Sequence, residues 1–190
     1  MVEMRPPTRR ERIYIALWEL GRVRVAELSR VTELPYPYVH REIRRLEREG
    51  VVVNSAGTVE IPDRKAFVML WAEDKRRIFE RVKGMRVKLL PGPKVLLSGS
   101  AALWAIGKVL SPAGGVAYVR KPEEAARLKS AGGYPMTLYS YDDFAFRFAK
   151  RAGRFSLPPW GMVLADLLAQ GMYTRLFEEV FEEVVGNGGD

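Results

Sequence analysis

The sequence contains no cysteine and only one histidine, His40. The lack of cysteine excludes disulfide bonds, cysteine-ligated zinc and thiol nucleophiles. A single histidine excludes a clustered-histidine metal site, and a hydrolase of the Ser-His-Asp type would have to use His40. Carboxylate-based acid–base and phosphoryl chemistry stay open, but we expect neither a cofactor nor a metal ion.

Long hydrophobic runs are missing as well. No apolar stretch approaches the ~18 residues needed to cross a bilayer, and the charged start MVEMRPPTRR is followed by no secretory h-region. We therefore expect a soluble, cytoplasmic protein with no membrane partner. With 190 residues and 47% hydrophobic content, the chain can form one compact domain or two small ones. Asn and Gln are scarce and Arg far outnumbers Lys, which suits a thermophilic source.

Start and stop signals frame the first predicted helix. Thr8, followed by Glu11, has the spacing of a capping box, so we expect a helix from there to about Leu20. Gly21 then supplies the stop. Residues 23–25 form a short extended segment rich in valine.

Two helices and a hairpin are predicted next. A brief helix over 26–31 and a turn over 32–35 lead to a longer helix over 36–48. β-branched runs at 51–53 and 58–61 enclose a turn segment and predict a β-hairpin. This order, with the ending RRLEREGVVV, resembles the winged helix-turn-helix superfamily that includes MarR-like repressors. The resemblance covers about a third of the chain and implies that the helix over 36–48 reads DNA.

This longer helix carries the candidate DNA-binding residues. If its apolar side faces the core, a step of about 100° per residue turns Tyr38, Arg41 and Arg45 outward. Arg41 and Arg45 are one turn apart, and each can form a bidentate pair with guanine. Residues near the helix start are expected to meet base edges, and Arg44 and Arg48 to meet the phosphate backbone. The predicted DNA-binding residues are Tyr36, Tyr38, His40, Arg41, Arg44, Arg45 and Arg48.

The same helix has an alternative interpretation. Glu42, Glu47 and Glu49 interleave with the arginines and can form ordinary ion pairs on a solvated face. Winged-helix domains also serve as protein-interaction modules. The hairpin tip over 54–57 has neither Arg nor Lys, which argues against its insertion into the minor groove.

Positive charge is concentrated in the middle of the chain. The net charge of +8 divides into +2 for residues 1–64, +6 for residues 65–94 and zero for residues 95–190. A basic region beside a DNA-reading motif is typical of phosphate contact. A solvated helix face is the alternative for residues 75–88.

The second half alternates predicted helices with predicted strands. Asp63 is expected to cap a helix running to about Lys83. An unassigned segment over 86–90 precedes strands at 95–97, 116–119 and 136–141 and helices at 101–110, 122–129, 160–169 and 173–185.

The segment LLSGSAAL at residues 96–103 resembles the opening of the nucleotidyltransferase fold. In active members the Gly-Ser turn holds the triphosphate, and the next strand bears paired aspartates for Mg²⁺. Here that strand, over 116–119, has no carboxylate, and metal-dependent phosphoryl transfer needs such ligands. Asp142 and Asp143 either replace one ligand or cap the next segment. The alternative for Gly99 and Ser100 is a tight strand-to-helix turn in which serine caps the helix, although amides there can also hold a phosphate.

A winged helix followed by such a domain without its metal ligands resembles the AbiEi-type antitoxins and related archaeal transcriptional regulators. The segment LPPWGMVLADLL at residues 157–168 is similar to their C-terminal helix opening. The resemblance implies promoter autoregulation, with a toxin as a further protein partner.

We therefore predict an α+β protein with three parts: a winged helix-turn-helix DNA-binding domain over 1–64, a connector helix and basic linker over 65–94, and a small α/β nucleotidyltransferase-like domain over 95–190. The predicted function is that of a sequence-specific transcriptional regulator of double-stranded DNA, without enzyme activity. We expect a homodimer, with the helix at 64–83 or at 173–185 as its interface. The alternatives are a small nucleotidyltransferase guided by a winged helix and a protein-interaction module.

Overall fold

The computed structural model describes most of the chain. The described residues are 9–82, 84–92, 94–121, 123–124, 128, 131–172 and 175–186. Thr8, most of the helix predicted over 122–129 and the start of the helix predicted at 173 lie outside them. In the described part of the chain, no helix combines the length and the apolar character that a membrane span requires.

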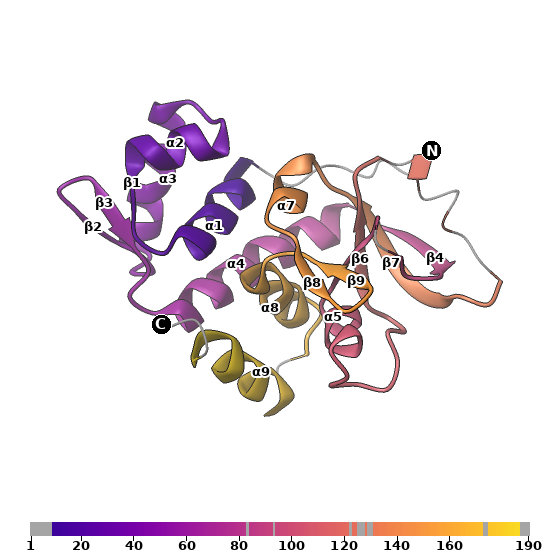
Figure 1. The fold of residues 1–190 in the computed structure, drawn as a ribbon. Coiled ribbons are helices and arrows are strands. Elements are labelled where there is room, and N and C mark those ends of the chain that lie inside the picture. Colours follow the sequence, from indigo (N-terminus) through magenta and orange to yellow (C-terminus); the bar gives the residue numbers. More distant parts are fainter. Residues whose placement is uncertain are drawn as a thin grey trace.

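Three helices and a three-stranded antiparallel sheet come first in the chain (Figure 1). They are α1 (Arg9–Leu20), β1 (Val23–Arg24), α2 (Val25–Thr32), α3 (Tyr36–Arg48), β2 (Val53–Ser55) and β3 (Thr58–Glu60). β3 lies between β1 and β2 in the sheet. The helices predicted in this region are confirmed, and Gly21, with φ of 67°, follows the end of α1 as expected.

The hairpin is confirmed, but its turn is tighter than the sequence pattern indicated. Val53 pairs with Glu60 and Ser55 with Thr58, so only Ala56 and Gly57 remain in the turn. Both turn residues have positive φ, 51° and 80°, as a two-residue type I′ turn requires. The predicted strand over 51–53 is therefore wrong at its start. Residues 51 and 52 are buried, but they precede β2, which begins at Val53.

The helix α4 (Arg64–Arg81) connects this part to a six-stranded mixed sheet. The carboxylate of Asp63 accepts hydrogen bonds from the amides of Lys65 and Ala66 at 2.9 Å, so the predicted cap is confirmed. The strands are β4 (Met85–Leu89), β5 (Leu96–Ser98), β6 (Val116–Val119), β7 (Tyr134–Ser140), β8 (Lys150–Ala152) and β9 (Phe155–Leu157), in the order β4-β7-β6-β5-β9-β8. The pairs β6–β7 and β5–β9 are parallel, and the other neighbours are antiparallel.

Four further helices are described around this sheet. They are α5 (Ser100–Ala105), α7 (Asp143–Arg147), α8 (Trp160–Ala169) and α9 (Arg175–Gly186). α5 ends well before residue 110, where the prediction placed its end, because the chain turns at Gly107 with φ of 78°. α7 and the β8–β9 hairpin have no counterpart among the predictions, whereas α8 has its predicted bounds.

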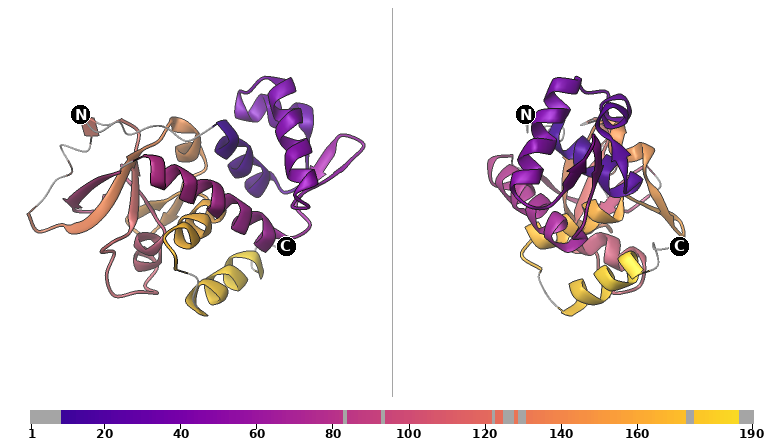
Figure 2. Two further views of the ribbon diagram at one scale, coloured as in Figure 1. Left: turned by 180° about the vertical axis from the view of Figure 1, so that it is seen from behind. Right: turned by 90° about the vertical axis from the view of Figure 1, so that its left-hand side faces the viewer.

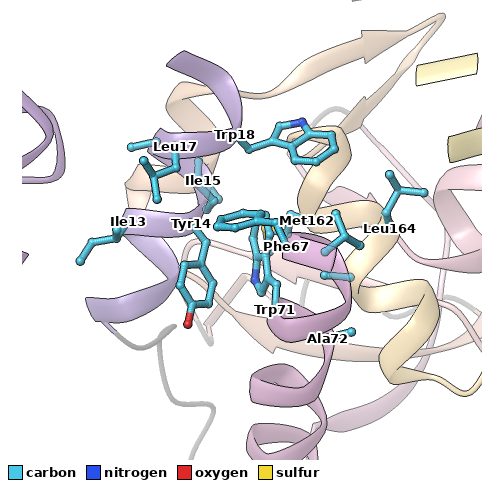
Figure 3. Close-up of a cluster of buried hydrophobic side chains, with 14 of the residues drawn as sticks. Ile13, Tyr14, Ile15, Leu17, Trp18, Phe67, Trp71, Ala72, Met162 and Leu164 are labelled. Carbon is cyan, nitrogen blue, oxygen red and sulfur yellow. The ribbon is translucent and has the colours of Figure 1, made fainter. Parts of the chain in front are cut away.

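α4 lies between the first three helices on one side and the six-stranded sheet on the other (Figures 1 and 2). Around it, Tyr14 of α1 meets Phe67 and Trp71 of α4 in edge-on ring contacts, each with centroids 5.6 Å apart. Figure 3 shows Met162 and Leu164 of α8 closing the other side of this cluster. One contiguous core thus crosses both boundaries predicted between the three parts, at residues 64 and 94. The predicted α+β class is confirmed.

The contact between α1 and α8 depends on a glycine. A Cβ atom added at Gly161 would lie 2.5 Å from Cδ2 and 2.7 Å from Cγ of Trp18, whose side chain is buried. Both distances are shorter than real Cβ contacts, so the indole or the helix would have to move.

We expect Gly161→Ala to lower the free energy of unfolding by about 1–3 kcal/mol, because overpacking outweighs the better helix propensity of alanine. Denaturant unfolding measures the change. The matched control is Gly186→Ala in α9, where an added Cβ meets nothing within 4 Å, and it should cause no loss. Equal stabilities of the two variants would contradict the close approach of α1 and α8.

Candidate nucleic-acid interface

The sequence fixes one side of α3 to the core. Pro35 precedes the helix and Pro37 lies in its first turn, where a missing N–H is tolerated. Val39, Ile43 and Leu46 are completely buried, as the 3.6-residue period predicts. The opposite side of α3 is therefore held outward.

Three arginines occupy the outward side. Arg41, Arg44 and Arg48 are all exposed, and none forms an ion pair with a residue that the structure describes. The guanidinium of Arg41 lies 5.5 Å from the ring centroid of Tyr38, and Nε of Arg48 donates to the carbonyl of Arg44 at 3.3 Å. Their charges are thus free to meet an anionic partner.

Two aromatic residues extend this surface toward the start of α3. Tyr36 is 49% exposed, and His40 is partly exposed one turn later. Their rings stack with centroids 5.9 Å apart and an interplanar angle of 23°. The structure therefore brings together five of the seven predicted residues on the exposed side of α3.

Arg45 does not belong to this surface, and the prediction that it faces outward is wrong. Its side chain is 21% exposed, and its Nε lies 2.7 Å from Oε1 of the nearly buried Glu42. Its other end lies 3.5 Å from Asp74 of α4 and donates to the hydroxyl of Tyr14 of α1. The buried side of α3 is wider than its apolar residues indicate, because Glu42 carries a charge network into the contact with α1 and α4.

Tyr38 lies at the edge of the exposed surface, beside the same network. It is partly buried, and burial raises its pKa, with the charge of Glu42 adding to the effect. The phenol therefore stays protonated near neutral pH and is available as a hydrogen-bond donor at the side of α3, away from the centre of the arginine surface.

Arg24 is an exposed cation that the sequence prediction missed. It lies in β1, paired with Thr58 of β3, one strand away from the uncharged hairpin tip. The signal in the sequence was the alternation of Val23, Arg24 and Val25, which places the arginine on the solvent side of a short strand. Arg24 forms no ion pair with any described residue, so it is a candidate for phosphate contact beside α3.

The basic middle segment, residues 65–94, offers fewer positive charges for contact with DNA than its net charge predicts. Lys75 lies in the basic region 65–94, for which phosphate contact was predicted, but it is 2% exposed, so the prediction is wrong for this residue. Arg76 and Arg77 are both exposed, but Arg76 donates to the carbonyl of Leu168 at 3.3 Å and Arg77 lies 3.8 Å from Asp74. The reason is that one side of α4 faces the core, and Lys75 lies on that side together with Phe67 and Trp71.

Lys75 is the centre of a buried polar cluster that joins α1, α4 and α8. Its Nζ lies 2.7 Å from Glu11 and 2.7 Å from Asp166, and it donates to the hydroxyl of Tyr118 in β6 at 3.0 Å. Asp166 also accepts hydrogen bonds from Tyr118 at 2.9 Å and from Ser98 of β5 at 2.5 Å. Each group in the cluster thus has partners from other elements.

Glu11 has a tertiary role that its position in the sequence did not predict. It lies in the first turn of α1, as the capping-box pattern predicted, while the capping partner Thr8 is outside the described residues. The Glu11 side chain is buried and accepts from Nε1 of Trp71 at 3.0 Å. This role follows from packing, because Lys75 and Trp71 lie directly against this face of α1.

The electrostatics of the cluster follow from one cation facing two carboxylates. Burial alone lowers the pKa of Lys75, but the charges of Asp166 and Glu11 outweigh it and the pKa is raised. Burial raises the pKa of Asp166, and the lysine charge only partly offsets this. Burial likewise raises the pKa of Tyr118 well above its usual value, followed by the charges of Asp166 and Glu11. Lysine therefore remains charged and holds the acids in place.

The Gly-Ser turn is closed by a side chain. Gly99 has φ of 54°, and a Cβ there would lie 2.1 Å from Oε1 of Gln170. That oxygen accepts from the amide of Ser100 at 3.4 Å, while Nε2 of the same glutamine donates to the carbonyl of Gly114 at 2.9 Å. Ser100 is the first residue of α5 and forms no side-chain cap, so the predicted serine cap is wrong. The geometry favours a structural turn over a phosphate site.

Asp142 and Asp143 are engaged in structural contacts. Asp142 caps α7 by accepting from the amide of Phe144 at 2.9 Å, and Nε of Arg12 donates to it at 2.8 Å. Asp143 lies 2.7 Å from Arg120. The capping alternative for this pair is confirmed for Asp142. Among the described residues, no three His, Asp or Glu side chains are grouped as metal ligands.

We expect Lys75→Met to lower the free energy of unfolding by about 3–5 kcal/mol, since it leaves two buried carboxylates without their cation. The matched control is the triple variant Glu11→Gln, Lys75→Met, Asp166→Asn, which removes all three charges at similar volume and should recover much of the loss. Urea unfolding at neutral pH measures both. A triple variant no more stable than Lys75→Met would contradict a charge effect.

Arg44 and Arg45 are expected to differ in stability although they are adjacent. Arg45→Ala should lower the free energy of unfolding by about 1–3 kcal/mol, because Glu42 and Asp74 lose a hydrogen-bonded cation. Arg44→Ala should leave it unchanged, because that side chain is exposed. Thermal unfolding of the two variants, compared at equal ionic strength, tests the difference. Equal midpoints would contradict the ion pairs of Arg45 and would mean that it belongs to the exposed surface.

Comparison with known proteins does not decide what this surface does. No protein-family model, no curated protein and no solved structure matches the chain. The resemblances to winged-helix regulators and to AbiEi-type antitoxins therefore stay predictions, and a function has to be argued from the exposed side of α3.

Proposed function

We propose that the protein is a sequence-specific regulator of transcription that binds double-stranded DNA through a winged helix-turn-helix unit. The observation that carries the proposal is the set of three exposed arginines, Arg41, Arg44 and Arg48, without ion-pair partners among the described residues, on a helix whose opposite side is fully buried. A helix held in this way can enter the major groove without being remodelled.

The surrounding elements support the same proposal. The order of helix, strand, two helices and hairpin, with the first strand added to the hairpin as a third, is the order expected of a winged helix. α2 and α3 are joined at Glu33, which has φ of 57°, so the chain makes the tight turn that the motif needs. Figure 1 shows the β2–β3 hairpin projecting beyond the helices, where a wing would lie.

The exposed residues take distinct roles in this proposal. Arg41 and Arg44 face the groove and contact base edges, in part as bidentate partners of guanine. Tyr36 and His40 contact thymine methyl groups or phosphates near the helix start. Arg48 contacts the phosphate backbone. Arg45 holds α3 in position from inside, and Arg24 is added as a backbone contact beside the wing.

The residues that the nucleotidyltransferase alternative needs are occupied in other ways. The Ser100 amide faces Gln170, and Asp142 serves Arg12 and the start of α7. Promoter autoregulation, a homodimer and a protein partner belong to the proposal as its further parts, and a palindromic site would support the dimer.

We expect selection from a pool of random duplexes to yield a consensus binding site. The affinities of single variants for this site then distinguish base contacts from backbone contacts. Arg41→Ala and Arg44→Ala should weaken binding to the selected site more than to random duplex, by about 1–3 kcal/mol for each lost base contact. Arg48→Ala and Arg24→Ala should weaken both equally and reduce the salt slope by about 1. Fluorescence anisotropy at several salt concentrations measures each value.

The matched control is Arg86→Ala, which removes the same charge from an exposed position in β4, at the far side of the molecule from α3 (Figure 1). It should leave duplex affinity unchanged. Absence of salt-sensitive duplex binding by the intact protein would overturn the proposal and favour a protein-interaction module. Labelled nucleotide transfer dependent on Ser100 or Asp142 would favour the enzyme.

A further inference from the structure

A pocket of about 380 Å³ lies where α1, α3 and α4 meet. Its lining residues come from all three helices: Arg10, Tyr38, Asp74, Arg77, Ile78 and Arg81. Its volume falls at the lower end of the roughly 300–1,000 Å³ typical of small-molecule sites. The Tyr38 side of α3 forms one wall, so the pocket is adjacent to the arginine surface without including its three central residues.

The lining has a net charge of +2, because three arginines face one aspartate. Arg77 is only loosely paired with Asp74, at 3.8 Å, whereas Arg10 lies 3.5 Å from Asp74 and 3.0 Å from Glu42. Arg81 is exposed and forms no ion pair within the described part of the chain. Donor groups therefore remain available for an anion, and guanidinium groups match the oxygens of phosphate with paired hydrogen bonds.

The same pocket also has a wall for a flat apolar group. The ring of Tyr38 and the side chain of Ile78 contribute apolar surface from α3 and α4. The Tyr38 hydroxyl, whose pKa is raised by burial, keeps its proton and can donate it in a hydrogen bond. A ligand that satisfies both halves of the pocket carries two negative charges at one end and a ring at the other.

We propose that this pocket binds a small phosphomonoester that bears a flat ring. A phosphomonoester carries close to two negative charges above a pKa of about 6, which matches the net charge of the lining, whereas a single carboxylate or a phosphodiester carries one. Arg81 and Arg77 hold the phosphate, and Tyr38 with Ile78 holds the ring.

Ligand binding would also reach α3. Nε of Arg10 lies 3.0 Å from Glu42 of α3, and this glutamate in turn holds Arg45 at 2.7 Å. A phosphate that draws Arg10 toward the pocket removes one cation from the network that positions α3. Binding of the phosphomonoester is independent of the proposed function; only a resulting change in duplex affinity rests on it.

Calorimetric titration of the intact protein with phenyl phosphate at pH about 7.5, where the phosphate is doubly charged, tests the proposal without DNA. We expect saturable binding of phenyl phosphate, weaker binding of inorganic phosphate and no binding of benzyl alcohol. Arg81→Ala should lower the affinity for phenyl phosphate about tenfold or more, the loss of one charge-assisted hydrogen bond. Arg86→Ala, the exposed control in β4, should leave it unchanged.

Several results would overturn the proposal. They are no saturable binding of phenyl phosphate, equal losses in Arg81→Ala and Arg86→Ala, or binding of inorganic phosphate as tight as that of phenyl phosphate. A second measurement, duplex affinity, distinguishes a ligand site from a site for the DNA backbone. Arg81→Ala should keep the duplex affinity of the wild type. If it weakens duplex binding as much as phenyl phosphate binding, the pocket holds a DNA phosphate and the proposal fails. If no duplex binds at all, the titration still decides the pocket, and only the proposed function fails.

Discussion

The buried ion cluster around Lys75 is the interaction on which the arrangement of the whole molecule depends. Its lysine comes from α4, its two carboxylates from Glu11 in α1 and Asp166 in α8, and its hydroxyl groups from the sheet. A buried charge is tolerated only with its partners in place, so these helices and strands have to pack in one relative orientation. Trp71 links the cluster to the buried aromatic side chains of α1 and α4 that Figure 3 shows, because its Nε1 donates to Glu11.

A second, smaller network of ion pairs fixes the position of α3 in the same way. Glu42 and Asp74 are nearly buried and hold Arg10 and Arg45 between three helices. The arginines of α3 thus have two roles. Arg45 pairs with these acidic residues and fixes the position of the helix, whereas the exposed arginines are available to a partner. The proposed ligand pocket lies at the edge of this network, so the same charges that orient α3 also shape the site beside it.

Elements with strong local signals could be predicted from the sequence. The bounds of α3 and α8 and the Asp63 cap of α4 follow from helical periodicity, proline positions and capping chemistry. The β8–β9 hairpin was missed because each of its strands has only three residues, too few for a pattern of alternating polar and apolar residues to be recognised. α5 was predicted too long because an apolar run continues past the point where the chain turns.

The sequence by itself determined that one side of the helix over 36–48 is buried and that its opposite side carries arginine, because the 3.6-residue period fixes both from local spacing. Only the tertiary structure decided which charged residues are free. Lys75, Glu11 and Arg45 look like ordinary surface residues in the sequence, yet each has its partner on another element. The partners of a charge lie far away in the chain, at distances that local periodicity does not encode, and the burial of that charge is settled only when the elements pack together.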